Sequence, residues 1–247
     1  MKFFITTLAA CLLSIPMHVG ATAHKIEPIH VVTSELPPLV MEGRPASPAG
    51  ALYDMVDEIA RRTGTPLIVE FVPWKRALFV SGTRTRTAVF PLTRNPERER
   101  QYRWLVRLYH EHFVFIARAG GRFDTRHPAR SKQRKVAILR GSAMMKDLQA
   151  RGYKHIVEAA TVAESVRYLT SGMVDAVFGD EAIMRTMLKG HPESGFAFSG
   201  PINSTTTWLG GSLDFGPAEE ARLQKAMRDM VADGSYATIL KKYQLSQ

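Results

Sequence analysis

Residues 135–142, KVAILRGS, contain the pattern that repeats along most of this 247-residue chain. The apolar run 136–139 predicts a buried strand, Gly141 a turn, and Ser142 the start of a helix that ends near Ala150. A strand that leads through a short turn into a helix is the repeating unit of α/β proteins with mainly parallel sheets. The stretch therefore predicts an α/β fold.

The same alternation continues on both sides of this stretch. Downstream, the apolar pattern predicts strands at 155–157 and 174–178 and helices at 162–170 and 181–189, the first of these helices with a capping box at Thr161 and Glu164. Two further helices are expected at the C-terminus, with apolar stripes over 223–230 and 236–243. Upstream, we expect strands at 30–33, 67–71, 87–90 and 109–117, and helices between Gly50 and Gly64, at 74–80 and from Pro96.

A segment without clear periodicity, residues 119–134, separates the two runs of alternating elements. It is rich in Gly, Arg and Pro, so we interpret it as a loop that enters a second unit. The chain should therefore form two α/β lobes rather than one sheet. No glycine-rich phosphate loop follows any of the expected strands, and we expect no cofactor.

The N-terminus predicts export. Lys2 precedes an uncharged apolar stretch at 3–16, too short to span a bilayer, and Ala21-Thr22-Ala23 has the form of a cleavage site. We interpret residues 1–23 as a signal peptide and expect a periplasmic protein. A lipoprotein, acylated at Cys11 within a Leu-Ala-Ala-Cys box, is the alternative. Cys11 is the one cysteine, so after cleavage the fold has no disulfide and no thiolate metal site.

The formal net charge of +10 does not by itself assign a partner. The basic residues are dispersed, and the sequence contains no basic helix with interleaved aromatic residues and no known nucleic-acid-binding module. We therefore expect no nucleic acid as a partner. An anionic ligand or an anionic envelope surface explains the charge equally well.

Three predicted strand-to-helix turns carry polar residues suited to a small ligand. Arg98 follows Asn95-Pro96-Glu97, which has the form of a helix start, and its guanidinium could bind a carboxylate through two parallel hydrogen bonds. Gly141-Ser142 could bind an anion at a helix N-terminus. Asp180 could hold an ammonium group. A solvated arginine and two ordinary N-caps explain the same residues, and spacing alone does not separate these interpretations.

Six motifs in order carry a resemblance over nearly all of residues 28–245. They are LPP at 36–38, VPWKRA at 72–77, LTRNPER at 92–98, KVAILRGS at 135–142, VDAVFGD at 174–180 and DGSY at 233–236. Together they resemble the polar-amino-acid branch of the bacterial extracellular solute-binding proteins. The resemblance implies a two-lobed, periplasmic-binding-protein-like fold of type II with a two-strand hinge, crossed near Ile116 and Ser204. Lobe 1 would comprise residues 24–116 and 205–247, and lobe 2 residues 117–204.

The resemblance also implies roles for residues of the site. Arg98 would bind the ligand α-carboxylate, helped by the Thr93 hydroxyl and by the helix start at Gly141 and Ser142, and Asp180 would bind the α-ammonium. Aromatic residues would enclose the ligand side chain. Here the sequence departs from the family, because Leu36, Leu39 and Ala143 replace two aromatic residues and a hydroxyl. Trp74 becomes the main candidate for the pocket wall, although a plain core role suits a tryptophan as well.

The triplet His110-Glu111-His112 is a weaker feature. Its two imidazoles would share one face of a strand, which is a spacing that could bind a metal. No third ligand is apparent, and simple alternation on a half-exposed strand explains the triplet too. We expect no metal site.

The leading functional hypothesis is a monomeric protein that captures an amino acid or related small carboxylate and delivers it to the inner-membrane permease of an ABC transporter. The first alternative is a periplasmic dehydratase on the same scaffold, of the kind that acts on arogenate or prephenate, with Glu35 or Glu181 as general acid. The second is a sensing subunit that binds a different periplasmic partner.

Overall fold

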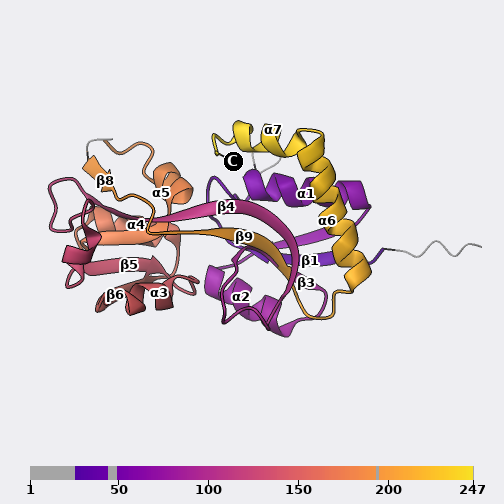
Figure 1. Cartoon of the computed structure of the whole chain (residues 1–247), viewed down its shortest axis with the longest axis horizontal. Coiled ribbons are helices and arrows are strands. Elements are labelled where there is room, and N and C mark those ends of the chain that lie inside the picture. The colour runs from indigo at the N-terminus through magenta and orange to yellow at the C-terminus, as the bar shows by residue number, and fades with distance from the viewer. Residues whose placement is uncertain (1–25, 44–48, 193–194, 247) are drawn as a thin grey trace, which may run out of the picture.

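The structure is a computed structural model that describes residues 26–43, 49–192 and 195–246 (Figure 1). The predicted signal peptide and Cys11 lie outside these residues. Within them, no helix combines the length and the apolar composition needed to cross a membrane.

Two groups of elements lie at opposite ends of the molecule, and two long strands, β4 (Arg103–Arg118) and β9 (Asn203–Gly211), run between them (Figure 1). The first lobe contains strands β1 (Ile29–Thr33), β2 (Leu67–Phe71) and β3 (Thr87–Thr93), and helices α1 (Ala51–Thr63), α2 (Trp74–Thr83), α6 (Pro217–Ala232) and α7 (Ser235–Lys242). The second contains β5 (Lys135–Leu139), β6 (His155–Ala159), β7 (Ala176–Asp180) and β8 (Phe196–Phe198), helices α3 (Met145–Ala150), α4 (Val162–Thr170) and α5 (Glu181–Met187), and a 3-10 turn at Pro128–Ser131.

The strands form one hydrogen-bonded sheet, in the order β2-β1-β3-β9-β4-β7-β5-β6, with β8 paired to β4. This corrects the expectation that each lobe would have a separate sheet. Within each lobe the strands are parallel, whereas β3–β9, β9–β4 and β4–β7 are antiparallel. The sheet is continuous because β9 pairs with β3 of the first lobe, β4 pairs with β7 of the second lobe, and β4 and β9 pair with each other. The residue boundaries proposed for the lobes stay a prediction.

Several predicted elements have their expected bounds. Strand β2 and helix α4 match residue by residue, and Thr161 caps α4 by accepting a hydrogen bond from the Glu164 amide at 3.1 Å. Helix α1 ends where Gly64 adopts the left-handed conformation, with φ of 64°. A residue with a Cβ adopts that conformation less readily, which is why the glycine predicted the helix end.

Other elements differ from the predictions, for local reasons. No helix begins at Pro96: residues 96–101 form turns, closed by the Arg98 amide, which donates to the Asn95 side chain at 3.0 Å. An asparagine that caps a helix can equally close an isolated turn. Helix α3 begins at Met145 rather than Ser142, because the Ser142 hydroxyl accepts from the Met144 amide in a turn. Strand β7 lies two residues later than expected, and β8 and β9 were not predicted from the residue pattern.

Each lobe has its own apolar packing against the sheet. In the second lobe, Phe115 of β4 is fully buried, and its ring lies 4.6–5.0 Å from the rings of Phe123, Tyr153 and Phe178. In the first lobe, α1 and α6 bury apolar stripes that include Met55 and Met230. This packing makes each lobe a rigid support for the residues between them.

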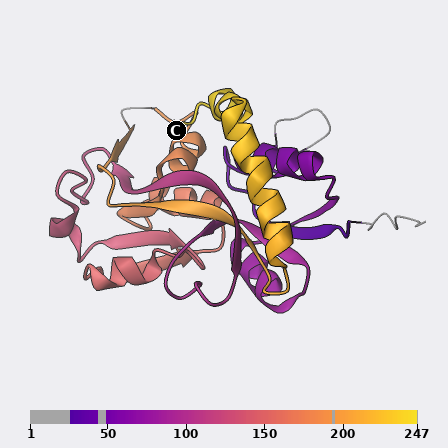
Figure 2. The same cartoon turned by 45° about the vertical axis from the view of Figure 1, so that its right-hand side comes forward.

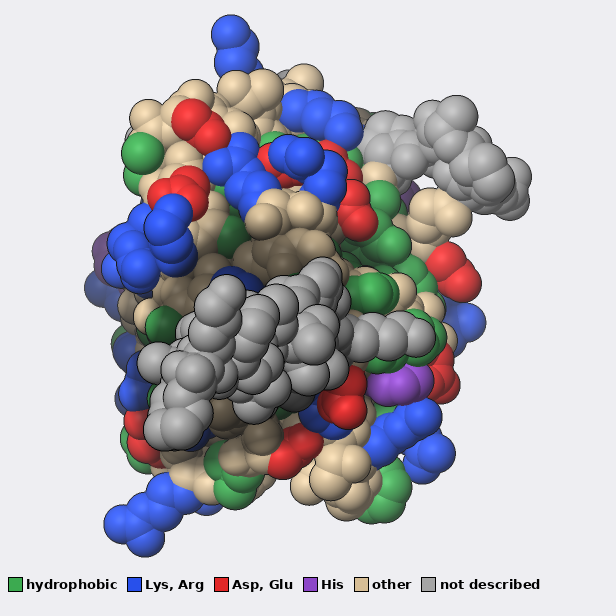
Figure 3. Space-filling view, turned by 90° about the vertical axis from the view of Figure 1, so that its right-hand side faces the viewer, with side chains coloured by type: hydrophobic (Ala, Val, Ile, Leu, Met, Phe, Trp, Pro, Cys, Tyr) green, Lys and Arg blue, Asp and Glu red, His purple; other side chains and the backbone are tan. Residues whose placement is uncertain are grey.

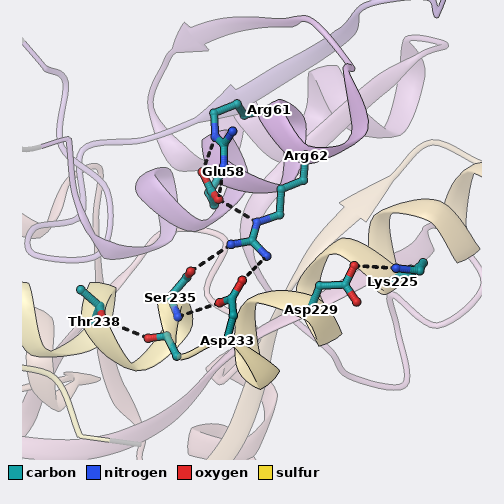
Figure 4. Close-up of polar contacts among 9 residues, drawn as sticks. Glu58, Arg61, Arg62, Lys225, Asp229, Asp233, Ser235 and Thr238 are labelled. Carbon is teal, nitrogen blue, oxygen red and sulfur yellow. Dashed lines mark hydrogen bonds and ion pairs between the residues drawn. The ribbon is translucent and has the colours of Figure 1, made fainter.

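The C-terminal helices return to the first lobe, and Figure 2 shows α6 lying beside α1. Arg62 of α1 joins these elements (Figure 4): its guanidinium donates to Glu58 at 2.7 Å, to Asp233 at 2.7 Å and to the Ser235 hydroxyl at 2.9 Å. These contacts join α1 to the junction of α6 and α7, at the end of the first lobe that lies away from the second lobe. On the face at this end, basic and acidic side chains are interspersed rather than gathered into a basic patch (Figure 3).

Candidate ligand-binding cleft

A cavity of about 70 Å³ lies between the two lobes. The first lobe and the long strand β4 contribute Leu36, Leu39, Trp74, Pro91, Thr93, Arg98, Glu111 and Phe113, and the second lobe contributes Leu139, Ser142, Ala143, Val162, Ser165, Val177, Phe178, Gly179, Asp180, Ile183 and Met184. Most of these side chains are apolar. The few polar groups among them therefore determine how a ligand would be oriented.

Arg98 lies at the centre of the interface between the lobes, with only 8% of its surface exposed. Its Nη1 donates to the Thr93 carbonyl of its own lobe at 3.0 Å, and its Nη2 donates across the cleft to the Gly141 carbonyl at 2.7 Å. Burial lowers the pKa of Arg98, but a guanidinium remains protonated in proteins. Arg98 is therefore a buried cation with further N–H groups beyond the two that bind these carbonyls.

Further contacts join the lobes on the outer side of Arg98. The Trp74 indole N–H donates to the Gly141 carbonyl at 3.3 Å, and the Asn95 side chain donates to the Ala143 carbonyl at 3.4 Å. Lys146 forms an ion pair with Glu97. The structure is therefore in a closed conformation, in which the turn after β5 lies against α2 and the Arg98 turn. Gly141 lines a second, outer hollow of about 500 Å³ rather than the inner cavity.

Thr93 and Glu111 form a buried pair inside the cavity. The Thr93 hydroxyl donates to Glu111 Oε1 at 2.6 Å, and both side chains are buried. Burial, and secondarily the charge of Asp180, raise the pKa of Glu111 to about 8, although the Thr93 hydrogen bond and Arg98 act in the opposite direction. A carboxyl group with this pKa is mainly neutral at pH 7.

Asp180 ends strand β7 and caps helix α5, where its Oδ1 accepts from the Ile183 amide at 3.0 Å. It is 5% exposed. Burial raises the pKa of Asp180 to about 6, against the lowering effect of the backbone hydrogen bonds from Ile183 and Ala182. The cap function and the position in the cavity are compatible, because a carboxylate can accept several hydrogen bonds.

Five of the six predicted site residues therefore line one cavity: Trp74, Thr93, Arg98, Ser142 and Asp180. Gly141 contributes its carbonyl to the contacts that close the lobes. Thr93 donates its hydroxyl to Glu111, and Ser142 Oγ accepts a backbone hydrogen bond in the turn before α3. Their predicted roles toward a ligand stay predictions.

Glu111 lines the cavity but was not predicted from the sequence, where the two histidines beside it suggested a metal site instead. The signal was present: Tyr109, Glu111 and Phe113 alternate along one strand, so Glu111 must share a face with two aromatic residues. On the other face, the rings of His110 and His112 lie 5.0 Å apart, and His112 Nδ1 lies 2.7 Å from the Ser204 hydroxyl. No three His, Cys, Asp or Glu side chains come together as a metal site within the described residues.

Solved structures with the same fold were found. A structure described as an ancestral arginine-binding protein bound to arginine is 20% identical, with 87% of this chain and 97% of that chain aligned and a TM-score of 0.76. A histidine kinase sensor domain with similarity to periplasmic binding proteins is 20% identical, with coverages of 87% and 95% and a TM-score of 0.78. The arginine-, lysine-, histidine-binding protein ArtJ from Geobacillus stearothermophilus is 17% identical, with coverages of 87% and 94% and a TM-score of 0.76.

These structures confirm the predicted two-lobed, periplasmic-binding-protein-like α/β fold of type II, and at these identities they show the fold alone. No curated protein sequence matches the chain. A family model, in contrast, matches almost all of the described residues, which is enough to assign the chain to a family. Residues 29–246 match the model of the bacterial extracellular solute-binding proteins, family 3, and the chain belongs to that family, as the resemblance predicted.

Proposed function

We propose that this protein captures a small amino acid in the cleft between its lobes and delivers it, in the periplasm, to the inner-membrane permease of an ABC transporter. The observation that carries the proposal is the joint presence of Arg98 and Asp180 in one small cavity whose lining is mostly apolar. A guanidinium and a carboxylate on opposite sides of a cavity match the two charges of an amino-acid zwitterion. Membership of a solute-binding family supports the same conclusion.

Ligand binding would be coupled to closure of the lobes. The cavity takes its walls from both lobes, so a ligand in it contacts both and favours the closed state over the open one. Arg98 already contacts the second lobe through the Gly141 carbonyl. A ligand carboxylate would accept hydrogen bonds from the N–H groups of Arg98 that do not bind the Thr93 and Gly141 carbonyls. It would thereby stabilise the same closed arrangement.

The experiment is isothermal titration of the purified mature protein with a panel of amino acids, repeated with Arg98→Ala. Removing one partner of a buried, charge-assisted contact costs about 2–5 kcal/mol, so we expect affinity for the bound amino acid to fall at least about 30-fold. Arg100→Ala is the matched control, because Arg100 is two residues away and exposed. Equal binding by wild type and Arg98→Ala would show that the assigned carboxylate site is wrong.

We further propose that the protein binds its ligand without converting it. A dehydratase reaction requires a general acid within reach of the substrate. The two acids that the sequence suggested for this role do not line the cavity: Glu35 is exposed and accepts a hydrogen bond from the Glu42 amide, and Glu181 pairs with Arg185 on α5. Two other acids, Asp180 and Glu111, do line it, and in this proposal they contact the ligand without protonating it. Incubation with prephenate and arogenate should yield no product, and turnover of either would contradict this part of the proposal.

A further inference from the structure

The cavity contains one carboxyl group more than is needed to bind the two charges of an amino-acid zwitterion. Two carboxyl groups, those of Glu111 and Asp180, face it, whereas Arg98 is the one Lys or Arg among its lining residues. An amino-acid zwitterion is neutral and would use Arg98 and Asp180. Glu111 then remains as a buried acid with no counterpart in the ligand, which is costly when the acid is ionised.

Glu111 is placed to act together with Asp180. Phe113 pairs directly with Asp180 across β4 and β7, and Glu111 lies two residues before Phe113 on the same face of β4. Glu111 and Asp180 are therefore diagonal neighbours on one face of the sheet, a relation that places backbones about 7–8 Å apart. Both carboxyl groups face the same cavity, so one short ligand can contact both.

Glu111 also has unused hydrogen-bonding capacity. Its side chain is 96% buried, given its 4% exposure, and Oε1 accepts from Thr93. Among the described residues, no hydrogen-bond donor reaches Oε2, and both donating nitrogens of Arg98 bind backbone carbonyls rather than either acid. Glu111 lines the cavity and Oε2 is not one of the fully buried atoms without a partner, so this oxygen is accessible from the cavity and could accept a ligand N–H group.

We propose that Glu111 is a ligand-binding residue and that the cavity selects short α-amino acids with a second amino group on the side chain. This rests on the proposed function: Arg98 binds the α-carboxylate, Asp180 the α-ammonium and Glu111 the side-chain ammonium. The ligand is short because the closed cavity is small, about 70 Å³, and because Leu36, Leu39 and Leu139 bound it.

Binding should release a proton. The charged and titratable groups that face Glu111 are Asp180 on β7, Arg98 on the turn after β3, and Tyr109 on β4 itself. With a pKa of about 8, Glu111 is mainly protonated at pH 7 before a ligand binds. An ammonium group beside Glu111 favours the ionised form, so its proton passes to the buffer when the ligand binds.

The test compares ligands in which a methyl group replaces the side-chain ammonium: 2,4-diaminobutyrate against norvaline, and ornithine against norleucine. We expect wild-type protein to bind at least one diamino acid about tenfold or more tightly than its methyl counterpart. Glu111→Gln, which keeps the acceptor for Thr93, should reduce this preference to about threefold or less, because the variant loses the charge that favours an ammonium group over a methyl group. Glu70→Gln, on an exposed position of the edge strand β2, is the control and should leave the preference unchanged.

Titration in two buffers of different ionisation enthalpy gives the second readout. Wild type should release close to one proton per diamino acid at pH 7, and Glu111→Gln should release almost none. If norvaline and norleucine bind as tightly as the diamino acids, or if Glu111→Gln weakens both kinds equally, the inference is wrong while the proposed function stands. If no amino acid binds, or if Arg98→Ala changes nothing, the proposed function itself fails and the inference fails with it.

Discussion

At the scale of single residues, the site combines groups that the sequence identified with one that it did not. Arg98, Asp180, Thr93, Ser142 and Trp74 could be placed near one another from the order of motifs, because strand ends and the turns after them meet at one edge of a sheet. The hydrogen bonds that these residues form could not be predicted from the order of motifs. Arg98 donates to the Gly141 carbonyl and Thr93 donates to Glu111, and these partners lie 43 and 18 residues apart in the sequence.

The raised pKa of Glu111 predicts how stability depends on pH. A carboxyl whose pKa is about 8 in the folded protein, against about 4.3 in an unfolded chain, holds its proton more tightly when folded. Its stabilising contribution is complete below the unfolded value and is lost as the pH rises towards 8. Asp180, with a pKa of about 6, adds to the same trend over the lower part of this range.

Urea denaturation at pH 5, 6, 7 and 8 measures this contribution. The free energy of unfolding of wild type should fall relative to that of Glu111→Gln as the pH rises, by at most about 1.4 kcal/mol per pH unit. Glu111→Gln is the reference, because the other titrating groups are the same in both proteins. Glu58 and Asp233, with pKa values of about 2, affect stability only at lower pH. Parallel curves for the two proteins would show that Glu111 titrates normally.

At the scale of elements, the turn between β5 and α3 is the part of the second lobe that meets the first. Gly141 adopts φ of 83°, and a Cβ at this position would lie 3.1 Å from Leu78 Cδ1 and 3.5 Å from the Trp74 ring, both on α2. The glycine thus lets the two lobes approach closely. A side chain here obstructs closure in addition to straining the turn.

Gly141→Ala should therefore weaken amino-acid binding, and we expect about a tenfold loss. Gly190→Ala is a matched control, because Gly190 has a similar φ of 94° but no atom within 4 Å of its Cβ position. Both variants should lose about 1–2 kcal/mol of stability from backbone strain, and only Gly141→Ala should lose affinity. Comparable affinities for the two variants, measured by calorimetric titration, would contradict a role for this turn in closure.

The elements also show what limits prediction from sequence. Helices with an apolar stripe and clear ends, such as α1 and α4, were predicted closely because their signals are local. Strand β9 was missed because Ser204 to Thr207 form a polar run, and its place between β3 and β4 is set by pairing with both neighbours. The supposed helix at Pro96 failed because its capping residues suit a turn equally well.

At the scale of the whole molecule, one sheet extends through two lobes, and the cavity between them is lined by Glu111 and Phe113 of the long strand β4 together with residues of both lobes. The two groups of parallel strands were predictable from the alternation of strands and helices. Their union into a single sheet was not, because it depends on the length of β4 and on the return of β9. Arg62 holds the C-terminal helices against the first lobe, and β4 and β9 are the two long strands that run between the lobes.

The most direct measurement of the central claim is a crystal structure of the protein with the amino acid that binds most tightly in the titrations. We predict a closed cleft in which the ligand carboxylate accepts hydrogen bonds from Arg98 and the α-ammonium donates to Asp180. A ligand that lies outside the cavity, or one whose carboxylate does not contact Arg98, would contradict the account.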